Sequence, residues 1–161
     1  MGSSFPVSDE GSGAWLGCEG LRRVLWARDG LISWTGLLRT LFERFESNPH
    51  TIVRWMTTAR PRDFGTIAQI IADHAAQGDA MGRHLMQTSA RHVDVMAERL
   101  RVLGVQRLAL MGGLSIKLEP FLSDETRNNL VAPRGDALSG ALRLARGAVE
   151  GAAATPATWP Q

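Results

Sequence analysis

The sequence predicts a helix-rich α/β protein. Long segments place apolar residues three and four positions apart, which is the period of an amphipathic helix. Only two short apolar runs, residues 107–111 and 130–132, have the length and composition of buried strands. Helices flank both runs, so we expect the two strands to be parallel. Of the 161 residues, 44% are hydrophobic and 21% are charged, which is typical of a globular protein.

Capping residues set the expected helix boundaries. Asp29-Gly30 forms a turn after the first helix, Asn48-Pro49 suits a helix start, and Asp79 caps the longest helix, which Gly104 ends. The expected helices cover residues 13–28, about 37–45, 49–60, 63–78, 79–104, about 120–128, and a last segment that begins at Gly135-Asp136. In this last helix, the side that should face inward carries Ala137, Leu138, Ala141, Leu142 and Leu144.

The chain divides into three regions. Residues 1–4 resemble a leader added for expression, residues 5–150 carry the core pattern, and residues 151–161 are rich in Ala, Thr and Pro and predict a flexible tail. Two short strands cannot form a stable sheet alone. Either the helices supply the core, or further strands come from sequence upstream.

The segment 8–17 is the most informative stretch. It joins the carboxylates Asp9 and Glu10 to Gly11-Ser12-Gly13, directly before the apolar positions of the first helix. One interpretation is a capped helix start, because side-chain oxygens and negative charge are favoured there. The other is a ligand-binding turn, in which glycine lets a ligand approach the backbone closely.

Five blocks together resemble the N-acetylglucosamine kinases and their relatives in the BadF/BadG/BcrA/BcrD-type ATPase family. They occur in the family's order and at about its spacing, and they cover the chain from Phe5 to about Val149. The blocks are Asp9-Glu10-Gly11-Ser12, Pro61-Arg62-Asp63-Phe64-Gly65, Ala75-Ala76-Gln77-Gly78-Asp79, Leu110-Met111-Gly112-Gly113-Leu114 and the segment 133–142.

The resemblance implies a fold and a set of site residues. The fold would be a partial ribonuclease-H-like lobe of the actin, hexokinase and Hsp70 superfamily, with the first three strands of its sheet missing upstream. Asp9, Glu10 and Gly11 would then bind the acceptor sugar. Gly65, Gly112, Gly113 and Ser115 would contact the nucleotide. Asp136 is better explained as a helix cap. Where the family has Gly-Trp-Gly in the sugar site, this chain has Gly2-Ser3-Ser4.

The family's phosphate-binding Asp-Gly-Gly-Gly-Thr-Lys hairpin and its catalytic Asp do not occur in this sequence. We therefore expect no catalytic residue here and interpret the chain as the C-terminal lobe of an amino-sugar kinase. In the whole enzyme, a hydroxyl of the sugar would attack the γ-phosphate of ATP bound with Mg²⁺. The sugar that the resemblance favours is N-acetylglucosamine. Whether this chain is itself an enzyme is left open.

Two other functions remain open. One is an ATPase that couples hydrolysis to another process, such as electron transfer through an iron–sulfur cluster, for which Cys18 alone gives little support. The other is a non-catalytic helical binding module. The net charge is only +2, and the sequence has no block of basic residues of the kind that binds nucleic acid. The histidines do not have the spacing of a metal site. With no apolar run of membrane-spanning length, we expect a cytoplasmic protein. If strands of the sheet are missing, its remaining edge and apolar helix faces are exposed, and we expect self-association through them.

Overall fold

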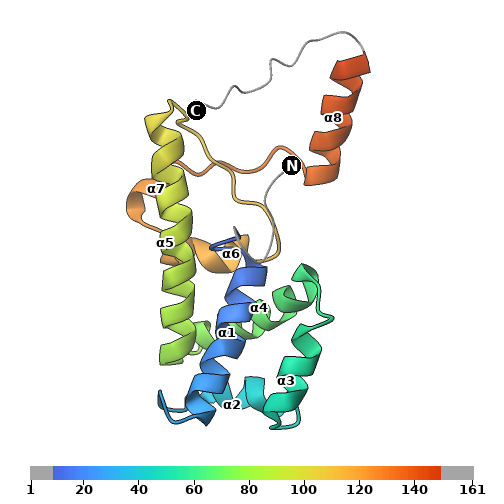
Figure 1. Ribbon diagram of the computed structural model, residues 1–161. Coiled ribbons are helices and arrows are strands. Elements are labelled where there is room, and N and C mark those ends of the chain that lie inside the picture. Colours follow the sequence, from blue (N-terminus) through green and yellow to red (C-terminus); the bar gives the residue numbers. More distant parts are fainter. Residues whose placement is uncertain (1–8, 150–161) are drawn as a thin grey trace.

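The computed structural model describes residues 9–149, and these are helical with irregular connections. Figure 1 shows the order of the elements along the chain. The helices are α1 (Gly13–Arg28), α2 (Gly36–Glu43), α3 (Pro49–Met56), α4 (Pro61–Ala76), α5 (Ala80–Val102), α6 (Ser115–Leu118), the 3-10 turn η1 (Glu119–Phe121), α7 (Asp124–Asn128) and α8 (Ala137–Val149). The proposed leader 1–4 and tail 151–161 lie outside the described residues.

The core lies where α1, α2, α4 and α5 pack together. Its fully buried side chains include Leu16, Leu37, Ile67, Ile71 and Leu85. Small residues allow the helices to approach closely. A Cβ atom on Gly17 of α1 would overlap the carbonyl oxygen of Phe64 on α4, and one on Gly82 of α5 would lie 2.8 Å from the backbone nitrogen of Ala75.

Most of the predicted helix boundaries are confirmed. The first helix spans Gly13–Arg28, with Asp29 as its C-cap, and Asn48 and Asp79 are the N-caps of α3 and α5. Two details differ. Ser12 caps α1 in place of Asp9 or Glu10, because its hydroxyl accepts from the backbone N–H of Trp15. The helix expected at 120–128 is interrupted at Leu122, whose backbone is extended between η1 and α7.

The two predicted strands are not confirmed. Residues 108 and 130 form an isolated parallel bridge, in which the N–H of Leu108 donates to Asn129 O at 2.9 Å and that of Val131 donates to Leu108 O at 2.7 Å. Leu108 and Leu110 are half-buried, whereas Arg107 and Ala109 are exposed. One bridge with no neighbouring strand does not extend into a ladder within residues 9–149.

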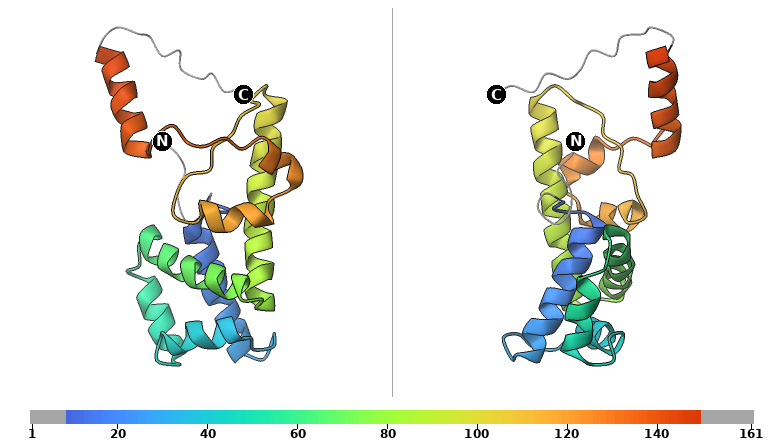
Figure 2. Two further views of the ribbon diagram at one scale, coloured as in Figure 1. Left: turned by 180° about the vertical axis from the view of Figure 1, so that it is seen from behind. Right: turned by 45° about the vertical axis from the view of Figure 1, so that its right-hand side comes forward.

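The expected inward side of α8 is also wrong. Leu138, Leu142 and Leu144 are 68%, 54% and 70% exposed, and Ala141 is exposed as well. Figures 1 and 2 show why: α8 stands clear of the other helices in every view, at the end of an extended connection. The amphipathic pattern is present, but this part of the chain offers it no surface to cover.

None of the helices within residues 9–149 combines the length and the apolar character needed to cross a bilayer.

Asp79 links two helices through one carboxylate. Its Oδ1 accepts from the N–H of Gly82 and its Oδ2 accepts from the N–H of Leu37, each at 2.9 Å. Partial burial raises the pKa of the Asp79 carboxyl, but these backbone hydrogen bonds outweigh burial and lower the pKa below its usual value. The carboxylate therefore stabilises the fold above the unfolded-state pKa of about 4, and this stabilisation is lost as the pH falls through the folded-state pKa.

We expect Asp79→Asn to destabilise the chain by about 1–2 kcal/mol at pH 7, because one cap acceptor becomes a donor. The difference from wild type should shrink as the pH falls below about 4. Urea unfolding at several pH values measures both effects. Asp29→Asn is the control, since that carboxylate pairs only with the neighbouring Arg28 at the surface. A difference between Asp79→Asn and wild type that stays constant with pH would contradict the linkage.

Candidate functional site

Three segments that are distant in sequence line one cavity of about 470 Å³. They are the turn before α1, residues 62–69 of α4, and the connection that leads into and through α6, and Val93 of α5 lines the cavity beside them. The cavity includes Gly11, Gly65, Gly112, Gly113 and Ser115, all of which the sequence had marked as site residues. Asp9 and Glu10 are not among its lining residues and lie in the turn immediately before Gly11.

The turn at residues 9–12 is closed by local hydrogen bonds. The N–H of Ser12 donates to Asp9 O at 3.0 Å, and the Ser12 hydroxyl donates to the Asp9 carboxylate at 2.5 Å. Gly11 has φ of +82°, in the region that favours glycine. Asp9 is half-buried and keeps unused acceptor capacity, whereas Glu10 is exposed. Asp9 therefore shapes the turn and can also accept from a hydroxyl-bearing ligand.

Helix α5 holds this turn in place. The Ser89 hydroxyl, which is fully buried, donates to Gly11 O at 2.8 Å. A Cβ on Gly11 would lie 3.1 Å from Ser89 O and 3.2 Å from the Cβ of His92. Any side chain at Gly11 would push the turn off α5. Sequence patterns did not indicate this role for Ser89, because a hydrogen bond across 78 residues leaves no local pattern.

Gly65 forms an open part of the cavity wall on α4. A Cβ there would meet no atom within 4 Å, so the position has space for a ligand and does not serve close helix packing. On the facing helix, a Cβ on Gly13 would lie 3.8 Å from the Cα of Gly65. Arg62, Thr66 and Gln69 line the cavity beside Gly65 and were not marked by the sequence. Their spacing, three to four residues apart on one helix face, is the signal that could have found them.

The Gly112-Gly113 turn forms the third wall. Gly112 has φ of +107°, and a Cβ there would meet no atom within 4 Å. Gly112 O accepts from both the Ser115 hydroxyl at 2.8 Å and the Ser115 N–H at 3.2 Å. The Ser115 side chain is thus engaged with its own turn. The exposed backbone of this turn is accessible to a flat ligand.

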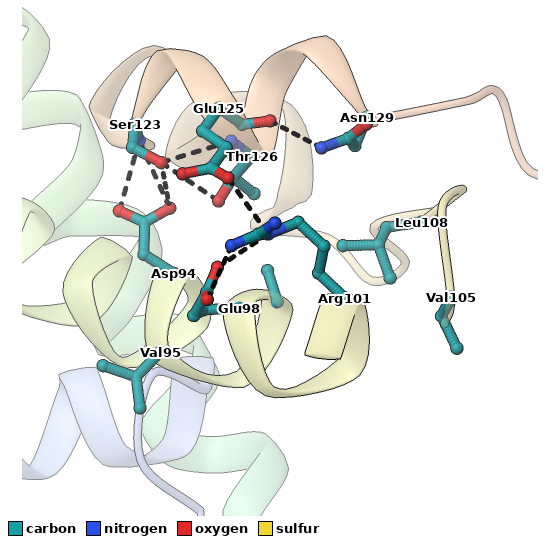
Figure 3. Close-up of a pocket in the computed structure, with 11 residues that line it drawn as sticks. Asp94, Val95, Glu98, Arg101, Val105, Leu108, Ser123, Glu125, Thr126 and Asn129 are labelled. Atoms are coloured by element: carbon teal, nitrogen blue, oxygen red, sulfur yellow. Dashed lines mark hydrogen bonds and ion pairs between the residues drawn. The ribbon is translucent and has the colours of Figure 1, made fainter. Parts of the chain in front are cut away.

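A second cavity, of about 370 Å³, lies between α5 and α7 (Figure 3). Its charged groups are engaged within the cavity: Arg101 contacts Glu98 at 2.7 Å and Glu125 at 3.0 Å, and Asp94 accepts from the Ser123 hydroxyl at 3.0 Å. The Arg101 guanidinium lowers the pKa of the Glu98 carboxyl. These contacts join α7 to α5, so we assign this cavity a structural role.

In the part of the chain that the structure describes, no three His, Cys, Asp or Glu side chains gather in a way that could hold a metal ion.

We expect Ser89→Ala to destabilise the chain by about 1–2 kcal/mol, because the Gly11 carbonyl loses its donor in a buried position. The loss should also speed hydrogen–deuterium exchange in residues 9–16. Thr88→Ala, the neighbouring substitution on α5, is the control, since that hydroxyl only donates to His84 O within the same helix. Unchanged exchange and unfolding in Ser89→Ala would show that the turn does not depend on α5.

Comparison with known proteins identifies two similar kinases. The chain is 35% identical over 144 residues to a glucosamine kinase of Vibrio cholerae, covering 89% of this chain and 49% of that protein. The solved structure described as a putative N-acetylglucosamine kinase from Chromobacterium violaceum matches with a TM-score of 0.79 and 31% identity, covering 89% of this chain and 50% of that one. No protein-family model matches the chain.

The chain therefore spans about half the length of the relatives that it matches. The resemblance expected from the sequence motifs is confirmed over that length. In sequence and in fold, the chain is similar to these two kinases over about half of their length.

Proposed function

We propose that this chain is the nucleotide-binding and sugar-binding C-terminal lobe of an ATP-dependent amino-sugar kinase. One observation carries the proposal: Gly65, Gly112, Gly113 and Ser115, which the motifs mark as nucleotide contacts, line the same cavity as Gly11 of the sugar motif. These residues are up to 104 positions apart, so their convergence is independent of the sequence spacing that singled them out. The names of the two similar kinases support the amino-sugar substrate.

The cavity suits a nucleotide in two respects. The positions of Gly65 and Gly112 are open, so a base or ribose can lie directly against the backbone. The cavity also lies beside the first turns of α1 and α4, where the partial positive charge of a helix N-terminus favours negative charge. Gly65, Gly112, Gly113 and Ser115 would hold ATP, which arrives with Mg²⁺ and supplies the phosphoryl group.

Asp9 would hold the sugar. A carboxylate accepts short, directional hydrogen bonds from hydroxyl groups, and the Ser12 hydroxyl fixes the orientation of this one. Glu10 and Gly11 shape the same turn, which α5 holds through Ser89. The proposed reaction is phosphoryl transfer to a hydroxyl of N-acetylglucosamine, and within this chain we assign the residues binding roles only.

The proposal extends to the architecture of the complete lobe. The parallel bridge between Leu108 and Leu130 would belong to a ribonuclease-H-like sheet whose other strands lie in the remaining half of the protein. The alternating exposure of residues 107–110 supports this, because it is the pattern of a strand with one covered face. A single free cysteine and the use of ATP are in keeping with a cytoplasmic location.

Nucleotide binding is the direct test. Titration of the chain with the fluorescent analogue mant-ATP should show saturable binding, and Gly65→Ala should weaken it about tenfold, because the methyl group enters the cavity. The same variant should be as stable as wild type or more so, since alanine favours a helix. Gly147→Ala, an equally open glycine in α8, is the control. Binding of mant-ATP by Gly65→Ala as tight as that of wild type would show that Gly65 does not contact the nucleotide.

Turnover is measured separately, as ADP release from Mg-ATP with and without N-acetylglucosamine. We expect none from this chain, because we assign it no catalytic residue. Sugar-dependent ADP release would overturn the interpretation as a lobe without the phosphate-binding hairpin.

We also propose that the chain self-associates. Apolar side chains are exposed along α5, at Val95, Met96 and Val102, and along α8, at Leu138 and Leu142. Exposed apolar surface of this extent favours association. Sedimentation velocity should show species larger than the monomer, and Leu142→Ser should shift the distribution towards monomer. Arg143→Ser, the neighbouring change that removes no apolar surface, should leave it unchanged. A monomer at every concentration would refute the proposal.

A further inference from the structure

The Gly112-Gly113 turn lies at the end of an irregular segment. Residues 105–113 form no helix, and Met111, Gly112 and Gly113 are exposed. Leu110 and Leu114 pack partly against the core on either side of the turn. Two consecutive glycines are otherwise the freest backbone a chain can have. Something must therefore fix the turn if it is to present a constant surface to a ligand.

A side chain of α4 makes that connection. The Gln69 Nε2 donates to Gly113 O at 3.2 Å, across 44 residues of sequence. Because a carbonyl oxygen can only accept, the nitrogen of the carboxamide must face the turn. The buried Ile67, Ala68 and Ile71 fix the rotation of α4 about its axis, and this places the neighbouring Gln69 at the cavity.

A second pair repeats this connection one helical turn further on. The Lys117 Nζ lies 2.6 Å from Asp73 Oδ1, and these residues are also 44 apart. Residues 69 and 73 are four apart on α4, as are 113 and 117 on the facing segment, so the two contacts lie side by side. Together they set the register of segment 113–117 along α4. Leu118, buried in the core, anchors its far end.

We propose that Gln69 is a positioning residue for the nucleotide: it holds the Gly112-Gly113 turn at the distance from Gly65 that the bound nucleotide requires. This inference rests on the proposed nucleotide site. Gln69 acts through its hydrogen bond to Gly113 and not by contact with the nucleotide. The proposed nucleotide contacts therefore remain Gly65, Gly112, Gly113 and Ser115. When the contact is lost, only a fraction of molecules has the turn in place, and the apparent affinity falls by that fraction.

The test uses Gln69→Leu, which keeps the size of the side chain and removes the donor. We expect the Kd for mant-ATP to rise about three- to tenfold, the range that one neutral hydrogen bond supports. The melting temperature should stay within about 2 °C of wild type, because the bond is exposed. Gln87→Leu, the same change at an exposed position on α5, is the control and should leave the Kd unchanged.

Hydrogen–deuterium exchange without nucleotide separates this inference from the proposed function. Gln69→Leu should speed exchange in residues 111–116, and Gln69→Arg, which keeps N–H donors, should restore slow exchange. Unchanged exchange and unchanged affinity in Gln69→Leu would overturn the inference. If wild type fails to bind mant-ATP while exchange responds as expected, the nucleotide site is wrong and the role of Gln69 in holding the turn stands.

Discussion

The close approach of α1 to α4 is the constraint on which the rest of the structure depends. Gly17 allows the two backbones to meet at Phe64, and Gly20 accommodates Ile71 one turn later, where a Cβ would lie 2.6 Å from the Ile71 Cδ1. Glycine has a low helix propensity, so these two positions lower the intrinsic stability of α1 and in return allow the α1 and α4 backbones to approach closely. The same approach brings Gly13 to the Cα of Gly65. The cavity is therefore a direct result of how these two helices pack.

Helix α5 completes the arrangement from the other side. Gly82 lets it pack against Ala75 near the end of α4, and Asp79 ties its first turn to α2. From its middle, the buried Ser89 reaches the turn that begins α1. One helix thus supports both the core and the position of Asp9. This is why a residue that touches no expected ligand can still set the geometry of the site.

Local patterns predicted most of what is local. Caps such as Asn48 and Asp79 act within one helical turn, so their positions in the sequence were enough to set the boundaries. The prediction of two strands was wrong because the pairing at Leu108 and Leu130 extends into a sheet only beside further strands, which a local sequence pattern does not supply. The motifs named the glycines of the cavity, whereas Ser89 and Gln69 stayed hidden, because their hydrogen bonds cross 78 and 44 residues. Such contacts depend on how helices pack, which periodicity does not specify.

The isolation of α8 has a consequence for handling the protein. It joins the helical body through residues 131–136, all of which are exposed. Exposed, extended backbone is what a protease needs to fit a chain into its active site. A cut there would remove α8 and leave all the residues that line the 470 Å³ cavity on one fragment, because the last of them is Leu118. The part of the chain that lines the cavity is therefore separable from the helix that follows it.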